Sequence, residues 1–159
     1  MMKLPQLVFS ALSVFICSCT WVSAPVSEAA PVSESALATT FKDPQLKWGP
    51  CPPFLPAGCA IAVLHGDPAK DNLDVFFKVP AKSTIPLHWH TSAERMVLVA
   101  GELHVTYDGQ EKAVLKPGTY AYGPAKRTHD GYCASKAPCV LFIAFESPLD
   151  AVPVEGKTK

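Results

Sequence analysis

Prolines and glycines interrupt this chain along almost its whole length, with 16 prolines and nine glycines among 159 residues. Proline breaks helices because it lacks an amide hydrogen, and glycine weakens them. The segments between these residues are short, rich in apolar side chains, and without the 3.6-residue period of an amphipathic helix. The sequence therefore predicts an all-β domain, with no more helix than a turn near residues 43–46.

Short apolar segments follow one another from Trp48 onward, separated by turn sequences. "CAIAVLHG" and "NLDVFFKVP" flank the turn "DPAKD", and "ELHVTY" and "EKAVL" flank an Asp-Gly pair typical of tight hairpins. "KPGT" places Pro and Gly at the central positions of a type II turn. Such close, even spacing predicts a β-sandwich or a small β-barrel. Strands are expected at residues 59–66, 72–80, 94–101, 102–107, 111–115, 119–124, 127–133 and 139–146.

The first 29 residues are predicted to be a secretory signal. Residues 1–3 include a lysine, and the apolar segment from Leu4 to Cys19 is shorter than the roughly 20 residues of a membrane-spanning helix. Cleavage is expected after Ala29; the alternatives are cleavage after Ala24 and lipid attachment at Cys19, which would anchor the protein to a membrane. A periplasmic or secreted location follows. The expected organisation is a signal peptide at residues 1–29, a flexible tether at 30–45, one domain at 46–150 and a disordered tail at 151–159.

Four cysteines remain once the signal segment is set aside. They form two close pairs, "CPPFLPAGC" and "CASKAPC", and in an exported chain an even number of cysteines favours disulfides. The simplest pairing joins Cys51 to Cys59 and Cys133 to Cys139, while the other pairings of four cysteines stay open. A zinc site is disfavoured because zinc-binding cysteines are usually spaced more closely than these.

The histidines of "PLHWHTSAE" have the spacing of metal ligands. His88 and His90 are alternate residues of a strand-like segment, so their side chains point to one face. Glu94 shares their parity beyond a short polar break, and His129 follows a proline-containing turn before a later strand. Three imidazoles and one carboxylate suit a divalent first-row metal, and octahedral coordination would leave two positions open.

These residues resemble the two conserved motifs of the cupin superfamily. The first motif is matched by His88, His90, Glu94 and Gly101, and the second by Gly118, Pro124 and His129, each with the spacing typical of cupins. The resemblance covers most of the chain after Trp48. It implies a cupin-type β-barrel, or jelly roll, in which His88, His90, Glu94 and His129 bind one divalent transition metal: iron, manganese, nickel or zinc.

The chain departs from the cupin motifs at three positions. Lys82 stands where the first motif usually has its leading glycine, Lys126 replaces the glycine of Pro-x-Gly, and Cys133 occupies the place of a frequent terminal asparagine. The upstream segment "WGPCPPFLPAGCAIAVLHGDP" looks like that of small bacterial cupins related to the cupin domain of the ChrR anti-sigma factor. An exported chain would have no cytoplasmic sigma factor to bind, so an anti-sigma function is not expected.

The remaining polar and aromatic candidates are expected to have structural roles. His65 and His104 are interpreted as ordinary hydrogen-bonded histidines, and Arg127 as a surface charge. Tyr120 and Tyr122 share a strand face and are expected to pack in the sandwich more readily than to line the site. Either Phe76 or Phe77 is expected to line the metal cavity, because neighbouring residues of a strand point to opposite faces. Trp89 is expected to pack inside the sandwich or between the subunits of a homodimer. For proton transfer, the motif strands offer only His104, Tyr107, Tyr120, Tyr122 and Arg127, and none of them stands out.

Two functional hypotheses remain. The first is an exported mononuclear metal oxidoreductase or dioxygenase acting on a small organic molecule. The second is a non-catalytic protein that binds or senses a metal or small ligand. A nucleic-acid partner is not expected, because 14 basic residues balance 14 acidic ones and form no cluster. A membrane partner is expected only if Cys19 carries lipid.

Overall fold

The computed structural model of this protein describes residues 35–155. The predicted signal peptide, its cleavage positions and Cys19 lie outside the described residues, as do residues 156–159. The domain discussed below begins at Ala38. Its elements are strands, and in the part of the chain that the structure describes no helix is long and apolar enough to span a membrane.

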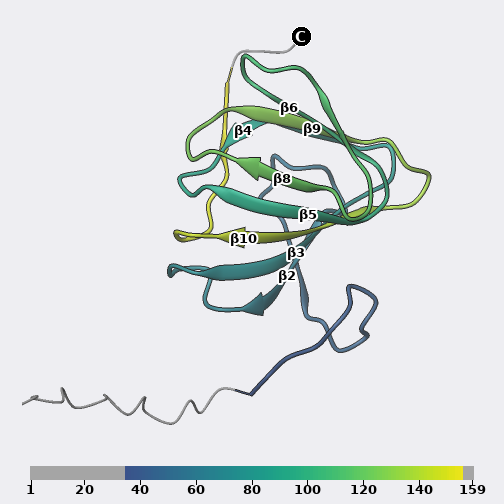
Figure 1. The fold of residues 1–159 in the computed structure, drawn as a ribbon, viewed down its shortest axis with the longest axis vertical. Coiled ribbons are helices and arrows are strands. Elements are labelled where there is room, and N and C mark those ends of the chain that lie inside the picture. Colours follow the sequence, from purple (N-terminus) through teal and green to yellow (C-terminus); the bar gives the residue numbers. More distant parts are fainter. Residues whose placement is uncertain (1–34, 156–159) are drawn as a thin grey trace, which may run out of the picture. The chain divides into compact units, whose positions relative to one another are not determined.

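Two antiparallel sheets lie face to face (Figure 1). The first sheet has the order β1-β2-β3-β10-β5-β8 and the second has the order β11-β4-β9-β6-β7. The strands of the first sheet are β1 (Trp48–Pro50), β2 (Ala60–His65), β3 (Leu73–Val79), β10 (Cys139–Phe145), β5 (Glu94–Ala100) and β8 (Tyr120–Gly123). Those of the second are β11 (Val152–Pro153), β4 (Thr84–Trp89), β9 (His129–Cys133), β6 (Leu103–Tyr107) and β7 (Ala113–Leu115). The prediction of an all-β jelly roll is confirmed.

The main core lies between the two sheets and is built by strand alternation. Alternate residues of a strand point to one face, so the apolar members of each strand meet those of the opposite sheet. Leu73, Leu98 and Leu141 from the first sheet are fully buried, and Leu103 and Val105 of β6 face them from the second sheet in the same cluster. Burial of this apolar surface is the main stabilising contribution to the fold.

A second apolar cluster lies around Phe76 and is separate from the main core. Phe76 packs there, whereas its neighbour Phe77 packs against the main core and lines the cavity described below. The alternation therefore settles which of the two phenylalanines faces the site. Phe41 and Leu46 pack against this cluster; Phe41 lies in the segment expected to be a flexible tether, and Leu46 is the first residue of the expected domain.

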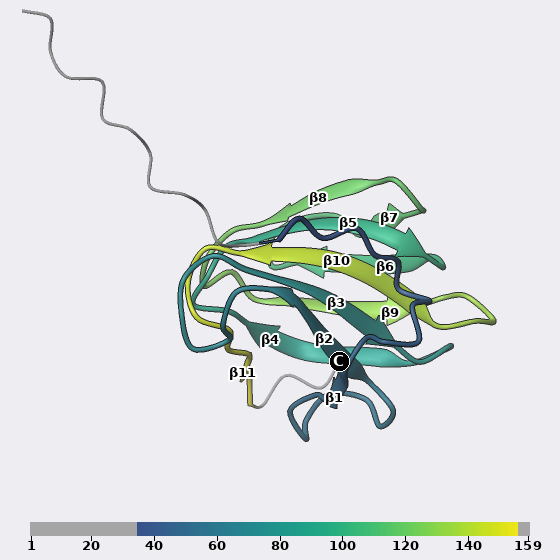
Figure 2. The same cartoon turned by 90° about the horizontal axis from the view of Figure 1, so that it is seen from below.

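The chain continues beyond the predicted end of the domain. Val152 and Pro153 form β11, which pairs with Trp89 and His88 of β4 (Figure 2). Part of the segment expected to be a disordered tail is therefore strand. The reason is that β4 offers an edge with unpaired backbone groups, which β11 covers.

Both predicted disulfides are present, Cys51–Cys59 and Cys133–Cys139. The first closes the loop between β1 and β2, and the second closes the loop between β9 and β10. Their presence is compatible with an extracellular location.

Two lysines adopt left-handed backbone conformations in the turns before β4 and β9. Lys82 has φ of 58° and Lys126 has φ of 60°. Glycine adopts this region at no steric cost, whereas a residue with a Cβ atom is strained there. Both stand where the cupin motifs usually have glycine, so the turns keep their shape without it.

Candidate metal centre

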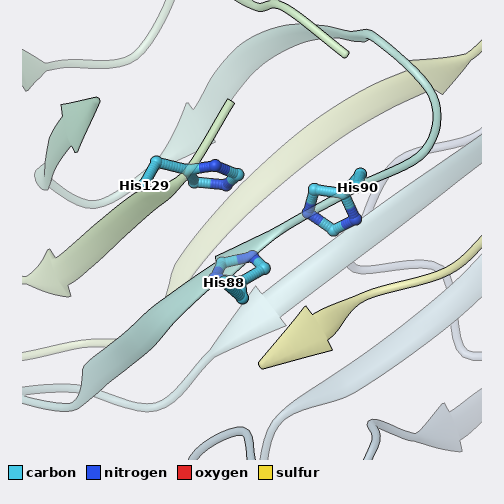
Figure 3. Close-up of side chains that lie close together, drawn as sticks. All are labelled: His88, His90 and His129. Atoms are coloured by element: carbon cyan, nitrogen blue, oxygen red, sulfur yellow. The ribbon is translucent and has the colours of Figure 1, made fainter. Parts of the chain in front are cut away.

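Three histidines, two on neighbouring strands and one directly after a strand, point toward one another (Figure 3). His88 lies on β4 and pairs in register with His129, the first residue of β9, while His90 follows the end of β4. One ring nitrogen from each of the three lies within 4.8 Å of the others, and all three residues are buried. The spacing predicted that His88 and His90 share a face, and the pairing of β4 with β9 brings His129 to them.

A backbone carbonyl holds Nδ1 of each imidazole. Nδ1 of His88 lies 2.7 Å from the Pro86 carbonyl oxygen, and Nδ1 of His129 lies 3.0 Å from that of Arg127. His90 Nδ1 makes the same contact with the Asp150 carbonyl oxygen. A carbonyl accepts only, so each Nδ1 donates, and in the neutral form of the ring the lone pair is then on Nε2. This is the arrangement found where histidines bind metals, because the hydrogen bond fixes the tautomer and the orientation of the ring.

Glu94 brings a carboxylate to the cluster from the opposite sheet. It is the first residue of β5 and is only 4% exposed. Its oxygens lie 3.3 Å from Nε2 of His90 and 3.5 Å from Nε2 of His129. The donor set thus consists of three imidazole nitrogens and one carboxylate at the end of the cavity between the sheets. Nitrogen and oxygen donors of this kind suit iron, manganese, nickel or zinc.

The surroundings of His88 and His129 favour the neutral imidazole, which is the form that binds metals. Burial is the main cause that lowers the pKa of His88 to about 3, and repulsion from His129 and His90 adds to it, against the opposing hydrogen bond to Pro86. Burial also lowers the pKa of His129, although the nearby Glu94 carboxylate acts in the opposite direction. The donor set therefore fits a divalent cation without first having to release protons from His88 or His129 near neutral pH.

A cavity of about 240 Å³ opens onto this cluster. Its walls are mostly apolar side chains from both sheets, among them Phe77 and Ile143 of the first sheet and Val105 of the second. Pro52 and Leu55, from the loop closed by the Cys51–Cys59 disulfide, contribute to the wall. The volume of the cavity lies just below the roughly 300 to 1,000 Å³ of typical ligand pockets, and its lining is that of a site for a small molecule.

Tyr107 also lines this cavity and was only one of several tyrosine candidates in the sequence. It is the last residue of β6, is opposite His129 in register, and its ring lies 4.8 Å from that of His129 between centroids. Gly123 leaves room for it: a Cβ atom at Gly123 would lie less than 3.0 Å from both the Tyr107 hydroxyl oxygen and a Glu94 carboxylate oxygen. Alternation along "LHVTY" could have indicated that Tyr107 shares the face of Leu103 and Val105.

The structure places the other candidate residues away from the cluster. His104 is paired with Glu102 at 3.0 Å, and His65 lies exposed at the end of β2, as their structural interpretation implied. Arg127 donates hydrogen bonds to the Asp108 carbonyl oxygen. The packing predicted for Tyr120 and Tyr122 is wrong, because their side chains are 60% and 53% exposed. They lie on an edge strand whose alternate residues face inward.

Comparison with known proteins identifies the family. Residues 75–145 match the model of the cupin domain, which spans the strands that carry the four candidate ligands. Residues 75–145 therefore form a cupin domain. The resemblance of its upstream segment to small bacterial cupins related to the cupin domain of ChrR stays a prediction. No curated protein sequence matches the chain.

Solved structures similar to this cupin share its fold. The DMSP lyase DddQ from Ruegeria pomeroyi DSS-3 matches with 20% identity and a TM-score of 0.59 over 70% of this chain and 64% of that one. An RmlC-like cupin from Shewanella frigidimarina NCIMB 400 matches with 22% identity and a TM-score of 0.55 over 66% and 86%. The polyketide cyclase RemF from Streptomyces resistomycificus matches with 14% identity and a TM-score of 0.61 over 76% and 88%. This cupin therefore spans less than two thirds of the length of DddQ, and the likeness concerns the fold.

Proposed function

We propose that this protein is an exported cupin in which His88, His90, Glu94 and His129 bind one divalent transition metal. The observation that carries the proposal is the set of three Nδ1 atoms fixed by backbone carbonyls, which leaves three Nε2 lone pairs within reach of one ion. Glu94 supplies the negative charge that partly neutralises a divalent cation in a buried site.

We further propose that the site is catalytic and that its reaction is an oxidation of a small organic molecule, of the mononuclear oxidoreductase or dioxygenase type. A bound iron or manganese ion would supply Lewis acidity and a redox couple. The chain itself orients the donors through their backbone hydrogen bonds, excludes water with the apolar walls, and holds the small molecule in the cavity next to the cluster. Similar folds carry different activities, since one relative is named a lyase and another a cyclase. The fold therefore does not choose the reaction.

The first experiment tests the ligands. Native mass spectrometry with elemental analysis of the purified protein is expected to give one metal ion per chain, and it also reports whether the protein is a homodimer. His90→Ala and His129→Ala are expected to weaken metal binding by orders of magnitude, since each removes one of four donors. His104→Ala is the matched control, because His104 pairs with Glu102 outside the cluster. Equal metal content in the wild type and in a His88→Ala/His90→Ala variant would refute the site.

The second experiment tests catalysis. Oxygen consumption is measured for the iron, manganese, nickel and zinc forms with small thiols, diols and phenols. The iron form is expected to turn over, and the zinc form is expected to be inactive because zinc has no accessible redox change. If one form binds a compound stoichiometrically and no form turns any over, the non-catalytic binding function replaces the enzyme.

Export rests on separate support. Two disulfides are compatible with an oxidising compartment, and residues 1–29 are predicted to be a signal peptide. N-terminal sequencing of the mature protein is expected to begin at Ala30, or at Pro25 for the alternative cleavage. A first residue of Cys19 carrying a lipid would make the protein membrane-anchored instead.

A further inference from the structure

The connection between β10 and β11 (residues 146–151) is fastened to the segment that follows β4. The amides of Glu146 and Ser147 donate to the hydroxyl oxygen of Ser92, at 2.8 and 3.1 Å. Ser92 is only 2% exposed, so the start of the connection is held at a buried point. Residues 149–151 then line the cavity. The β10–β11 connection therefore passes directly beside the candidate metal centre.

Asp150 binds two consecutive residues of the segment after β4 through three hydrogen bonds. Its backbone carbonyl oxygen accepts from Nδ1 of His90. Its carboxylate accepts from the amide of Thr91 at 2.8 Å and from the Thr91 hydroxyl at 2.5 Å, with one bond to each carboxylate oxygen. Because the carboxylate is fixed to Thr91, the carbonyl of the same residue is held at a defined position relative to the His90 ring.

His90 differs in this respect from the other two histidines of the cluster. The carbonyls that hold His88 and His129 belong to Pro86 and Arg127, each two residues earlier in the chain. The carbonyl that holds His90 comes from a residue 60 positions away. The orientation of the His90 ring therefore depends on a tertiary contact, whereas the other two rings are oriented by their own strands.

The backbone of His90 is anchored independently of the Asp150 side chain. The amide of Lys126 donates to the His90 carbonyl oxygen at 2.7 Å. On the preceding residue, Trp89 of β4 pairs with Val152 of β11. Loss of the Asp150 carboxylate is therefore expected to loosen the carbonyl that orients the His90 ring and to leave the His90 backbone in place.

We infer that Asp150 is a positioning residue for the metal ligand His90. Its carboxylate fixes Thr91, and its carbonyl thereby keeps Nδ1 of His90 in a hydrogen bond and Nε2 turned toward the cluster. The inference rests on the proposed function, since His90 is a ligand only if the cluster binds a metal. Groups that orient metal ligands typically change metal affinity about 10- to 100-fold when they are lost.

A purely structural role for Asp150 makes different predictions. If its carboxylate only tied the β10–β11 connection to the domain, its loss would lower the melting temperature and leave the metal centre unchanged. Asp43 is the matched comparison, because its carboxylate also accepts from a threonine hydroxyl, that of Thr39 at 3.1 Å, and from a backbone amide, that of Gln45 at 2.8 Å. Asp43 lies outside the lining of the cavity.

The experiment titrates cobalt(II) into the metal-free protein and follows both the affinity and the visible absorption spectrum, which reports the geometry of the cobalt ligands. Asp150→Ala is expected to bind cobalt about 10- to 100-fold more weakly than the wild type and with an altered spectrum. Asp43→Ala is expected to keep the affinity and the spectrum of the wild type. The two variants should lose comparable amounts of melting temperature, because each loses two side-chain hydrogen bonds of the same kind.

Variants of Thr91 test the same inference without changing the residue that carries the carbonyl. Thr91→Val keeps the amide donor and loses the hydroxyl, so cobalt binding should weaken by roughly 3- to 10-fold, the effect of one lost hydrogen bond. Thr91→Ser keeps both donors and should rescue the affinity and the spectrum. These two variants decide the question if Asp150→Ala does not fold.

NMR of the histidine rings in the metal-free protein separates this inference from the proposed function. The Nδ1 proton of His90 is expected to be protected from solvent exchange in the wild type and to lose that protection in Asp150→Ala, while the Nδ1 proton of His88 keeps it. If the wild type binds no cobalt and His90 behaves in this way, the metal function fails and the orienting role of Asp150 stands.

Three results would overturn the inference. The first is a wild-type cobalt affinity and spectrum in Asp150→Ala or in Thr91→Val. The second is an equal loss of cobalt affinity in Asp150→Ala and Asp43→Ala. The third is an unchanged Nδ1 proton of His90 in Asp150→Ala.

Discussion

Replacement of Gly123 by alanine tests how closely the site is packed. The added Cβ atom would lie less than 3.0 Å from the Tyr107 hydroxyl oxygen and from a Glu94 oxygen, closer than such atoms approach in proteins. Glu94 can rotate, but the Tyr107 ring packs against His129 and cannot move without displacing that residue. Overpacking of this kind costs about 1 to 3 kcal/mol. For a domain of this length, the melting temperature should fall by roughly 4 to 12 °C.

The assay combines thermal unfolding of the metal-free protein with a metal titration against a chelator. Gly123→Ala is expected to lower both the melting temperature and the metal affinity, because it displaces Glu94 directly and His129 through the Tyr107 ring. Gly49→Ala is the matched control, because its Cβ atom would meet nothing closer than the Ile61 carbonyl oxygen at 3.8 Å.

A double variant identifies the cause of the destabilisation. Gly123→Ala combined with Tyr107→Phe removes the oxygen that causes the closest contact, so part of the lost stability should return. The free-energy changes of the two substitutions should therefore not add. Equal melting temperatures of Gly123→Ala and Gly49→Ala, or strict additivity in the double variant, would refute the reasoning.

Three further predictions concern pH, the second disulfide and a strained turn. Folding lowers the pKa of His88 from an ordinary 6.5 to about 3, so the unfolded chain binds a proton at His88 more readily than the folded protein does. The metal-free protein should therefore be fully stable above pH 6.5, and its free energy of unfolding should fall by on the order of 5 kcal/mol between pH 6.5 and 3. Denaturant unfolding at several pH values measures this, and His88→Gln should flatten the profile. Replacing Cys133 and Cys139 with serine opens a loop of sequence separation 6, which should lower the free energy of unfolding by about 2 kcal/mol. It should also weaken metal retention, because β9 carries both Cys133 and His129. Unchanged metal affinity in competition with a chelator would contradict this. Lys126→Gly should stabilise the protein by about 0.5 to 1 kcal/mol, because φ of 60° strains lysine more than it costs glycine in chain entropy; a lower denaturant midpoint would argue against it.

Most of the fold could be predicted from the sequence because local signals specify it. Turn sequences separate the apolar segments, and the strands β2, β3 and β10 lie within the ranges expected for them. The strand β4 was less visible, because it contains Pro86 and proline usually argues against an interior strand. The pairing of β4 with β9 is irregular between Ile85 and His88, so the missing amide hydrogen of Pro86 is accommodated there.

The candidate site was predictable in its donors but not in its surroundings. The two-residue spacing of His88 and His90 determines a shared face, and the motif spacing indicated Glu94 and His129. The carbonyl partners of these histidines were not visible in the sequence. His90 depends on the Asp150 carbonyl, 60 residues away, which reaches it only because β11 pairs with β4.

By itself, the sequence indicated most of the strands, the four candidate donors and the two cysteine pairs, since these depend on spacing between residues close together in the chain or on motifs. Only the tertiary structure decided which aromatic side chains face the site. Tyr107 lines the cavity, while Tyr120 and Tyr122 are exposed. Alternation gives two faces to every strand but does not say which is inner. That choice depends on the sheet order and register, which are set by contacts between distant segments.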